Sequence, residues 1–213
     1  MSTNLKKKIC IIDLNLGNLN SIYNAVQSLG YCPIISNEKN YIINSSKIIL
    51  PGNGNFNFAM QQLKILNLEE LIKNEVLKKG KIILGICLGM QIMFELGYEE
   101  NKTEGLGFFR GKVEIIKNLK NLKTFSLPHI GWNEVDIINS KSLIYKGIKN
   151  NSSFYYLNSY VCNSENLTNI TGYTEYSQKF ISSVESENIF GVQFHPEKSQ
   201  NCGIILIKNW LEL

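Results

Sequence analysis

The chain has 213 residues, of which 44% are hydrophobic and 19% charged, and its formal net charge is +4. These values are typical of a globular domain with a sizeable buried core, and they exclude collagen-like, low-complexity and predominantly disordered classes. No apolar run approaches the roughly 20 residues of a membrane-spanning helix, and the first apolar run is too short for a secretory leader, so we expect a cytoplasmic protein without membrane association.

The first half of the sequence alternates short apolar, β-branched runs with amphipathic stretches. We expect strands at residues 8–13, 33–36, 47–50 and 81–86, and helices at residues 21–29, 58–79 and 91–96. The strand at 81–86 is apolar throughout, so we predict that it is buried on both faces. Strands and helices that alternate in this way indicate parallel βα units.

After Gly105 the pattern changes to strands at hairpin spacing. These strands are expected at residues 111–116, 134–138, 154–161, 168–174, 180–186 and 189–194. An amphipathic helix at 203–211 follows them. We therefore predict an α/β fold in one domain over residues 1–213, with a mixed, mostly parallel central sheet flanked by helices and antiparallel strands in the C-terminal half.

Cys87 lies in the segment GICLGMQ, where the apolar strand is expected to give way to a helix. Gly85 and Gly89 relieve crowding in a tight strand-to-helix turn, so G-x-C-x-G is the thiol form of a nucleophile elbow. The N-terminus of the following helix would direct N–H groups and a positive dipole at the sulfur, which favours the nucleophilic thiolate. Taken alone, so short a motif also fits a buried structural cysteine.

A second feature, QFHPE at 193–197, strengthens the catalytic interpretation. Pro196 favours an extended conformation at His195, and a spacing of two lets the side chains of His195 and Glu197 face the same side. A carboxylate there can fix the imidazole tautomer while the other ring nitrogen serves the thiol. Cys87, His195 and Glu197 are therefore the candidate triad for covalent acyl transfer; the alternative is a strand-end histidine beside a surface glutamate.

A third feature is the glycine-rich turn PGNG at 51–54, which follows another predicted strand. Acyl transfer needs hydrogen-bond donors for a tetrahedral oxyanion. Backbone N–H groups of this turn, together with that of Leu88, can supply them. Without the other two features the segment is simply a turn.

Other classes of site are not expected. The two histidines, His129 and His195, are far apart in the sequence and there is no cysteine cluster, which argues against a metal site. The sequence also contains neither a Walker loop nor a GxGxxG motif, so we expect no cofactor. Arg110 is the only arginine, and the lysines are dispersed, which argues against nucleic-acid binding. The five cysteines are irregularly spaced, which favours free thiols over a disulfide framework.

PGNG, GICLGMQ and FHPE, in this order and at these separations, resemble the oxyanion turn, nucleophile elbow and His–Glu pair of the class I (triad) glutamine amidotransferases. DLNLGNLNSIY (13–23), PHIGWN (128–133), GYTEY (172–176) and FHPEKS (194–199) are most similar to the glutaminase subunits of imidazole glycerol phosphate synthases. The resemblance spans essentially the whole chain. It implies hydrolysis of glutamine to glutamate and ammonia without a cofactor, and delivery of the ammonia to a (β/α)8-barrel synthase in a heterodimer. That partner forms imidazole glycerol phosphate and an aminoimidazole carboxamide ribotide in histidine biosynthesis.

Carried over position by position, the resemblance also implies roles for individual residues. Cys87 attacks the amide of glutamine, His195 protonates the departing ammonia and then activates water, and Glu197 orients His195. Backbone N–H groups of Gly52 and Leu88 complete the oxyanion hole. The residues implied in binding the glutamine headgroup are Gln91, Ser159 and Tyr160. The residues implied at the partner interface are Asn18, Pro128, Ile130, Trp132, Tyr155 and Lys198.

The sequence departs from the family pattern at two positions near these sites. Asn53 stands where the turn usually reads PGVG, and Asn158 stands where a histidine commonly precedes the Ser/Thr-Tyr pair. These two departures do not decide which partner receives the ammonia or how active the chain is alone. A paralogous glutaminase that feeds another amidating enzyme, for example in amidino-sugar synthesis, would share the same motifs. PHIGWN and FHPEKS disfavour a γ-glutamyl peptidase, and the intact candidate triad disfavours a non-catalytic binding subunit.

Overall fold

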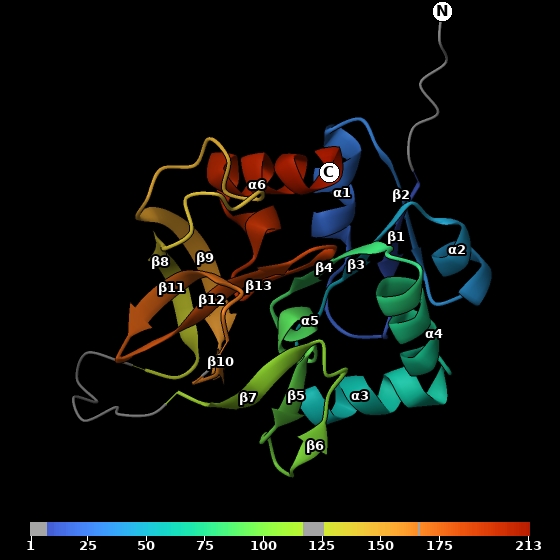
Figure 1. The fold of residues 1–213 in the computed structure, drawn as a ribbon, viewed down its shortest axis with the longest axis horizontal. Helices are drawn as coiled ribbons and strands as arrows, with labels where there is room; N and C mark the ends of the chain where they lie inside the picture. Colours follow the sequence, from blue (N-terminus) through green and yellow to red (C-terminus); the bar gives the residue numbers. More distant parts are fainter. Residues whose placement is uncertain (1–7, 117–125, 166) are drawn as a thin grey trace, which may run out of the picture.

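The structure is a computed structural model that describes residues 8–116, 126–165 and 167–213. Its centre is a mixed sheet whose parallel strands lie side by side (Figure 1). In spatial order these strands are β2 (Cys32–Ser36), β1 (Lys8–Ile12), β3 (Lys47–Leu50), β4 (Ile82–Ile86) and β13 (Ile189–Val192). A strand from near the C-terminus thus lies directly beside β4.

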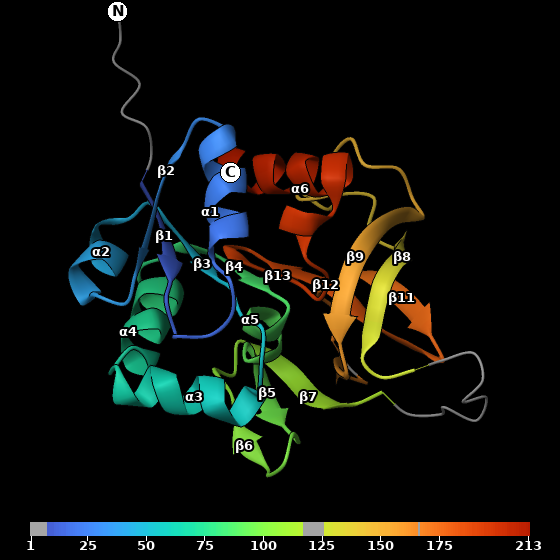
Figure 2. The same ribbon diagram turned by 180° about the vertical axis from the view of Figure 1, so that it is seen from behind.

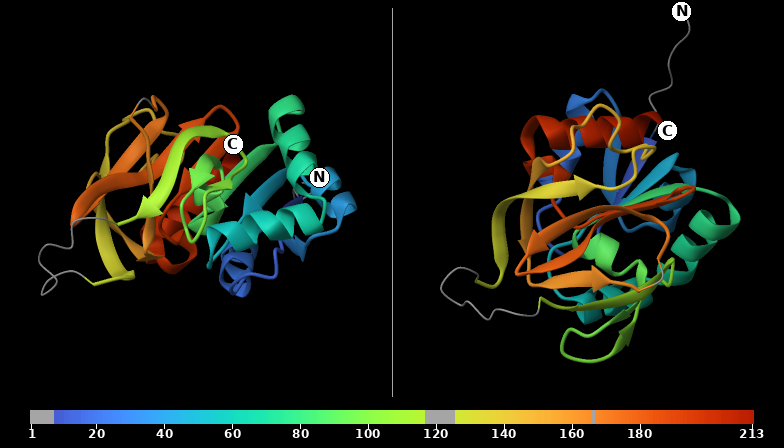
Figure 3. Two further views of the ribbon diagram at one scale, coloured as in Figure 1. Left: turned by 90° about the horizontal axis from the view of Figure 1, so that it is seen from below. Right: turned by 60° about the vertical axis from the view of Figure 1, so that its left-hand side comes forward.

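Antiparallel strands extend this sheet beyond β13. In spatial order they are β12 (Gln178–Ser186), β10 (Tyr160–Asn163), β7 (Phe109–Ile115), β5 (Phe94–Gly97) and β6 (Thr103–Glu104), with β5 parallel to β7. A branch leaves β12 through β11 (Ile170–Tyr176), β8 (His129–Ile137) and β9 (Ser152–Asn158). Figure 3 shows the branch at the opposite end of the molecule from α2 (Lys39–Asn44). The α/β class with a mixed sheet is confirmed.

Helices cover both faces of the parallel strands. They are α1 (Asn20–Ser28) and α6 (Gln200–Glu212) on one face, and α3 (Phe56–Ile65) and α4 (Glu69–Lys73) on the other. Figure 2 shows α1 next to α6. Ile9 and Ile11 pack into the core under α1 and α6, whereas Cys10 and Ile12 pack under α3, because successive side chains of a strand point to opposite faces. In the described part of the chain, no helix is long and apolar enough to cross a membrane.

The predicted helix at 58–79 is divided in the structure. It consists of α3, α4 and a π-helical segment, Asn74–Lys78. Asn67 separates α3 from α4, because its φ of 53° is left-handed and cannot continue a right-handed helix. The short helix α2 and the strand β6 were not predicted, and the predicted strand at 154–161 is split at Ser159 into β9 and β10.

The predicted helix at 91–96 is wrong. The helix α5 (Leu88–Gln91) ends where that helix was expected to begin, and the chain then enters β5. Ile92, Met93 and Phe94 are fully buried. Consecutive apolar positions that are all buried do not form the one-sided stripe of an amphipathic helix. The nucleophile elbow is therefore followed by a single short helix at the centre of the protein.

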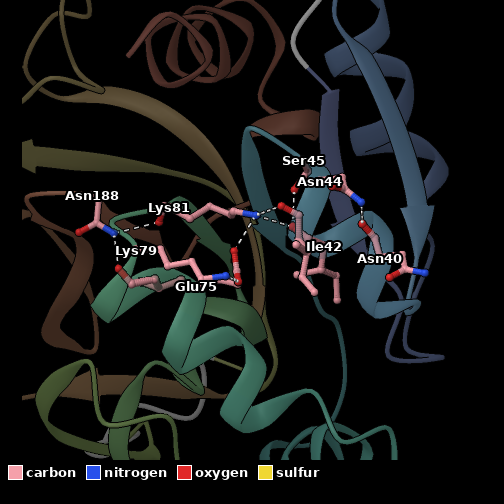
Figure 4. Close-up of polar contacts among 10 residues, drawn as sticks. Asn40, Ile42, Asn44, Ser45, Glu75, Lys79, Lys81 and Asn188 are labelled. Carbon is pink, nitrogen blue, oxygen red and sulfur yellow. Dashed lines mark hydrogen bonds and ion pairs between the residues drawn. The ribbon is translucent and has the colours of Figure 1, made fainter.

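A buried ionic cluster joins α2, the π-helical segment and the start of β4 (Figure 4). Glu75 is only 1% exposed, and its carboxylate pairs with Lys79 and, at 2.9 Å, with Lys81. Lys81 Nζ also donates to the carbonyls of Ile42 and Ile43 at 2.6 and 2.7 Å. Burial alone would raise the pKa of Glu75, but the two lysines hold it below its ordinary value. Glu75 is therefore charged in the fold, and its carboxylate is held by both lysines.

Candidate active site

Cys87 occupies a sharp turn between β4 and α5. Its φ of 54° lies in the left-handed region, and its N–H donates to Val192 O at 2.8 Å. A Cβ at Gly85 would lie 2.8 Å from the Gly89 backbone, and a Cβ at Gly89 would lie 1.7 Å from Leu50 O. Only glycine fits at these two positions. The sequence therefore forms the strained elbow that it predicts, with the thiol almost fully buried.

His195 and Glu197 follow β13, the neighbour of β4. Ile86 pairs with Val192 in parallel register, so the two segments leave the same edge of the sheet together. His195 Nδ1 and Glu197 Oε1 are 2.8 Å apart, and both side chains are buried. Among the described residues, His195 Nε2 has no hydrogen-bond partner, and the nearby Cys87 sulfur acts electrostatically on the ring. The structure thus brings the predicted triad together.

The electrostatics of this cluster favour a charged imidazole. Burial alone would lower the pKa of His195, but the Cys87 sulfur and the Glu197 carboxylate outweigh burial and raise the pKa to about 10. At neutral pH the ring is therefore an imidazolium beside the Glu197 carboxylate and the Cys87 sulfur. This arrangement can stabilise a thiolate and can donate a proton to a leaving group.

A cavity of about 430 Å³ lies in front of Cys87. Gln91, Ser159 and Tyr160, the residues predicted to bind substrate, line this cavity. Gln91 Nε2 donates to Tyr160 O at 2.8 Å, which holds α5 against the junction between β9 and β10. The volume suits a small amino acid, and the lining offers several polar groups.

Two further residues of this region were missed from the sequence. Glu99 lines the same cavity, accepts a hydrogen bond from the Phe56 N–H at 2.8 Å, and has its pKa raised by burial. Gln193 is fully buried and its Nε2 lies 3.7 Å from the Cys87 sulfur. The sequence signal for Gln193 was a glutamine directly after the apolar run IFGV. No neighbouring residue in the sequence indicates that Glu99 belongs to the site.

The residues expected to form an oxyanion hole lie together. A Cβ at Gly52 would be 3.0 Å from Leu88 Cβ, so the PGNG turn contacts the first residue of α5. The first N–H groups of a helix have no acceptor within the helix, which leaves that of Leu88 available beside Cys87. Gly52 also borders a smaller cavity, of about 60 Å³, with His195 and Glu197.

The predicted interface residues lie around these cavities. Ile130 and Trp132 are 58% and 48% exposed, and Asn18, Pro128 and Lys198 are exposed. Tyr155 is half-buried; its ring centroid lies 6.1 Å from that of Trp132 and 5.8 Å from Lys198 Nζ. Pro128 borders the larger cavity, and Asn18 and Lys198 border the smaller one. An exposed, partly aromatic surface is thus continuous with the candidate triad.

No other reactive centre is seen in the portion of the chain that the structure describes. Its histidine, cysteine and carboxylate side chains form no group of three or more suited to a metal ion. All five cysteines are free. Burial raises the pKa of Cys10 to about 11, so this thiol is unreactive at neutral pH.

Known proteins of one family match this chain over nearly its full length. The family described as "Glutamine amidotransferase class-I" matches residues 10–210. The chain is 41% identical over 209 residues to the "Imidazole glycerol phosphate synthase subunit HisH" of Pelagibacter ubique, covering 96% of this chain and 99% of that protein. It is 42% identical over 207 residues to the protein of the same name from Pyrococcus furiosus, with coverages of 97% and 99%.

Solved structures share the fold at much lower identity. The "Structure of PurLQS from Thermotoga maritima" matches with a TM-score of 0.73 and 17% identity, covering 98% of this chain and 99% of that one. A "Crystal structure of glutamine amidotransferase" matches with a TM-score of 0.72 and 15% identity, with coverages of 96% and 97%.

Proposed function

The chain belongs to the class-I glutamine amidotransferase family, and on that premise we propose that it is the glutaminase subunit of an imidazole glycerol phosphate synthase. The observation that carries the proposal is the meeting of Cys87 with the His195–Glu197 pair at the ends of two adjacent parallel strands. The chain is also about as long as the relatives named HisH. We expect it to act in the cytoplasm, where free thiols stay reduced.

In the proposed reaction, the Cys87 thiolate adds to the side-chain amide carbon of glutamine, and the N–H groups of Gly52 and Leu88 stabilise the oxyanion. His195 gives its Nε2 proton to the amide nitrogen, so the C–N bond breaks and ammonia leaves a thioester. The neutral ring then takes a proton from water, whose oxygen attacks the thioester carbon. Glutamate is released, and the thiolate and imidazolium are restored, with Glu197 orienting the ring throughout.

Glutamine would lie in the cavity in front of Cys87. Gln91, Ser159 and Tyr160 are proposed to hold its headgroup, since they border this cavity and are joined by the hydrogen bond from Gln91 to the Tyr160 carbonyl. Glu99 offers a carboxylate in the same cavity, and we assign it to the α-ammonium group of the substrate.

The ammonia is proposed to pass to a (β/α)8-barrel synthase subunit bound over the exposed surface around Trp132, Tyr155 and Lys198. That surface carries an aromatic pair and a lysine, residue types that suit an interface anchor. It also adjoins the small cavity beside His195 and Glu197, so the acceptor would dock next to the site of ammonia release.

Covalent labelling tests the proposed nucleophile directly. The glutamine-analogue electrophile 6-diazo-5-oxo-L-norleucine should add once to the protein, at Cys87, and excess glutamine should slow the addition. Cys87→Ala should abolish the adduct. Cys32→Ala is the matched control, because Cys32 is an exposed thiol that the proposal does not use. An adduct that persists in Cys87→Ala, or its complete absence in the unaltered protein, would contradict the assignment.

A further inference from the structure

A chain of amide hydrogen bonds connects the Cys87 sulfur to the wall of the glutamine cavity. Gln193 Nε2 lies 3.7 Å from the sulfur, and its Oε1 accepts from Gln91 Nε2 at 3.1 Å. Gln91 Nε2 also donates to Tyr160 O at 2.8 Å, and Asn158 Nδ2 donates to the same carbonyl at 3.0 Å. The three side-chain amides are all more than nine-tenths buried. A shift of the cavity wall can therefore change the position of Gln193 next to the thiol.

The chain ends at Asn158 Oδ1, which is buried and has no hydrogen-bond partner among the described residues. Directly opposite on β8 is His129, and the two residues are paired in the β8–β9 register. His129 Nδ1 is likewise buried and unpaired within the described ranges. His129 Nε2 faces Asn133 Nδ2, an amide donor, at 3.4 Å. Nε2 is therefore the acceptor and Nδ1 carries the hydrogen, so an unpaired donor and an unpaired acceptor belong to residues paired across two strands.

We propose that His129 Nδ1–H donates to Asn158 Oδ1 when glutamine occupies the cavity, and that His129 is thereby a positioning residue for glutamine hydrolysis. This inference rests on the proposed function. Side chains directly opposite each other on antiparallel strands have Cβ atoms about 4.5–5.5 Å apart, so small rotations bring such groups into contact. An unpaired buried donor and an unpaired buried acceptor are both destabilising, and one bond satisfies both.

The surroundings of His129 fit a fixed, neutral ring. It is stacked between Tyr176 and Tyr156, with ring centroids 3.9 and 4.9 Å away. Burial lowers the pKa of His129 to about 4, so Nδ1–H belongs to an uncharged imidazole at neutral pH. The neighbour before it, Pro128, borders the Cys87 cavity, and the exposed Trp132 follows on the same strand. The bond would thus join the proposed partner-facing strand to the amide chain.

A double-mutant cycle tests the pair. His129→Phe keeps an aromatic ring for stacking but removes Nδ1–H, and Asn158→Leu removes both Oδ1 and the Nδ2 donor at similar volume. We expect each to lower kcat/KM for glutamine about tenfold in the complex with the synthase subunit, and the double variant to lose little more than Asn158→Leu. Tyr176→Phe is the matched control, since it keeps the stack and both unpaired atoms, and it should leave kcat/KM unchanged. Independent effects of about a hundredfold in the double variant, or no effect of His129→Phe, would overturn the proposal.

A second measurement decides the matter if a variant fails to fold. Cys87→Ala protein, which cannot turn glutamine over, is labelled with 15N and titrated with glutamine. The imidazole Nδ1–H resonance of His129 should move downfield and exchange more slowly with water as glutamine binds. A resonance that does not respond to bound glutamine would overturn the proposal. Failure of the unaltered complex to hydrolyse glutamine would instead refute the proposed function, and this inference with it.

Discussion

Replacing Glu197 by Gln tests how much the candidate triad depends on its carboxylate. In the structure Oε1 lies 2.8 Å from His195 Nδ1, both side chains are buried, and Oε2 has no partner among the described residues, so His195 is the main group that compensates this charge. Breaking a buried ion pair by removing one member costs about 3–5 kcal/mol. If the transition state loses about 3–4 kcal/mol of this stabilisation, kcat falls about 10²–10³-fold.

The assay is glutamate release at saturating glutamine in the presence of the synthase subunit, with Glu212→Gln, an exposed carboxylate of α6, as the matched control. The variant should also lower the pKa of His195, which is about 10 in the unaltered protein, although the Cys87 sulfur, the larger cause of the raised pKa, remains. Because that pKa lies above the 6.5 of a free imidazole, the stability that the pair contributes is fully present below pH 6.5 and is lost as the pH rises through about 10. A variant within threefold of the unaltered kcat would refute the assigned role of Glu197.

Other consequences concern the surface, the ionic cluster and the buried histidine. Trp132→Ala should weaken binding of the synthase subunit about 30–1000-fold, as expected for an aromatic anchor worth about 2–4 kcal/mol, and titration calorimetry measures it. Glu75→Gln leaves the cation of Lys81 without its carboxylate. We expect the free energy of unfolding to fall by about 3 kcal/mol and the melting temperature by about 6–12 °C, with unchanged turnover below the transition. For His129 the pKa of about 4 lies below that of a free imidazole, so the unfolded chain takes up its proton first. Stability should therefore be complete above pH 6.5 and decline as the pH falls toward 4, and His129→Phe should flatten this slope in acid denaturation.

Local patterns in the sequence were sufficient for the elbow and for much of the parallel sheet. Gly85 and Gly89 flank Cys87 because no Cβ fits at either position, and the G-x-C-x-G pattern in the sequence indicates this requirement directly. Likewise, the continuous apolar run of β4 predicted burial on both faces, and that strand is almost completely buried. These features depend on residues that are close together in the chain.

Features that depend on distant contacts could not be predicted in the same way. A helix was predicted at residues 91–96, but pairing with the more distant β7 makes Phe94–Gly97 a strand. Glu99 reaches the Cys87 cavity through the return of the chain after β5, and no local signal marks it. The pairing of β4 with β13, which brings Cys87 to His195, joins segments about a hundred residues apart, so the strand pattern did not predict it. The candidate triad was predicted instead from the chemistry of the two motifs and from their resemblance to a known family.

The measurement that tests the account most directly is glutamate release from glutamine by the purified chain, with and without an imidazole glycerol phosphate synthase barrel subunit and the nucleotide ligand of that subunit. We predict low activity for the chain alone and strong stimulation that requires the partner and increases with its ligand. Labelling of Cys87 without stimulation would retain the glutaminase but contradict the assigned partner, and would direct the search to another amidating enzyme. Absence of both labelling and glutamate release would contradict the catalytic account itself.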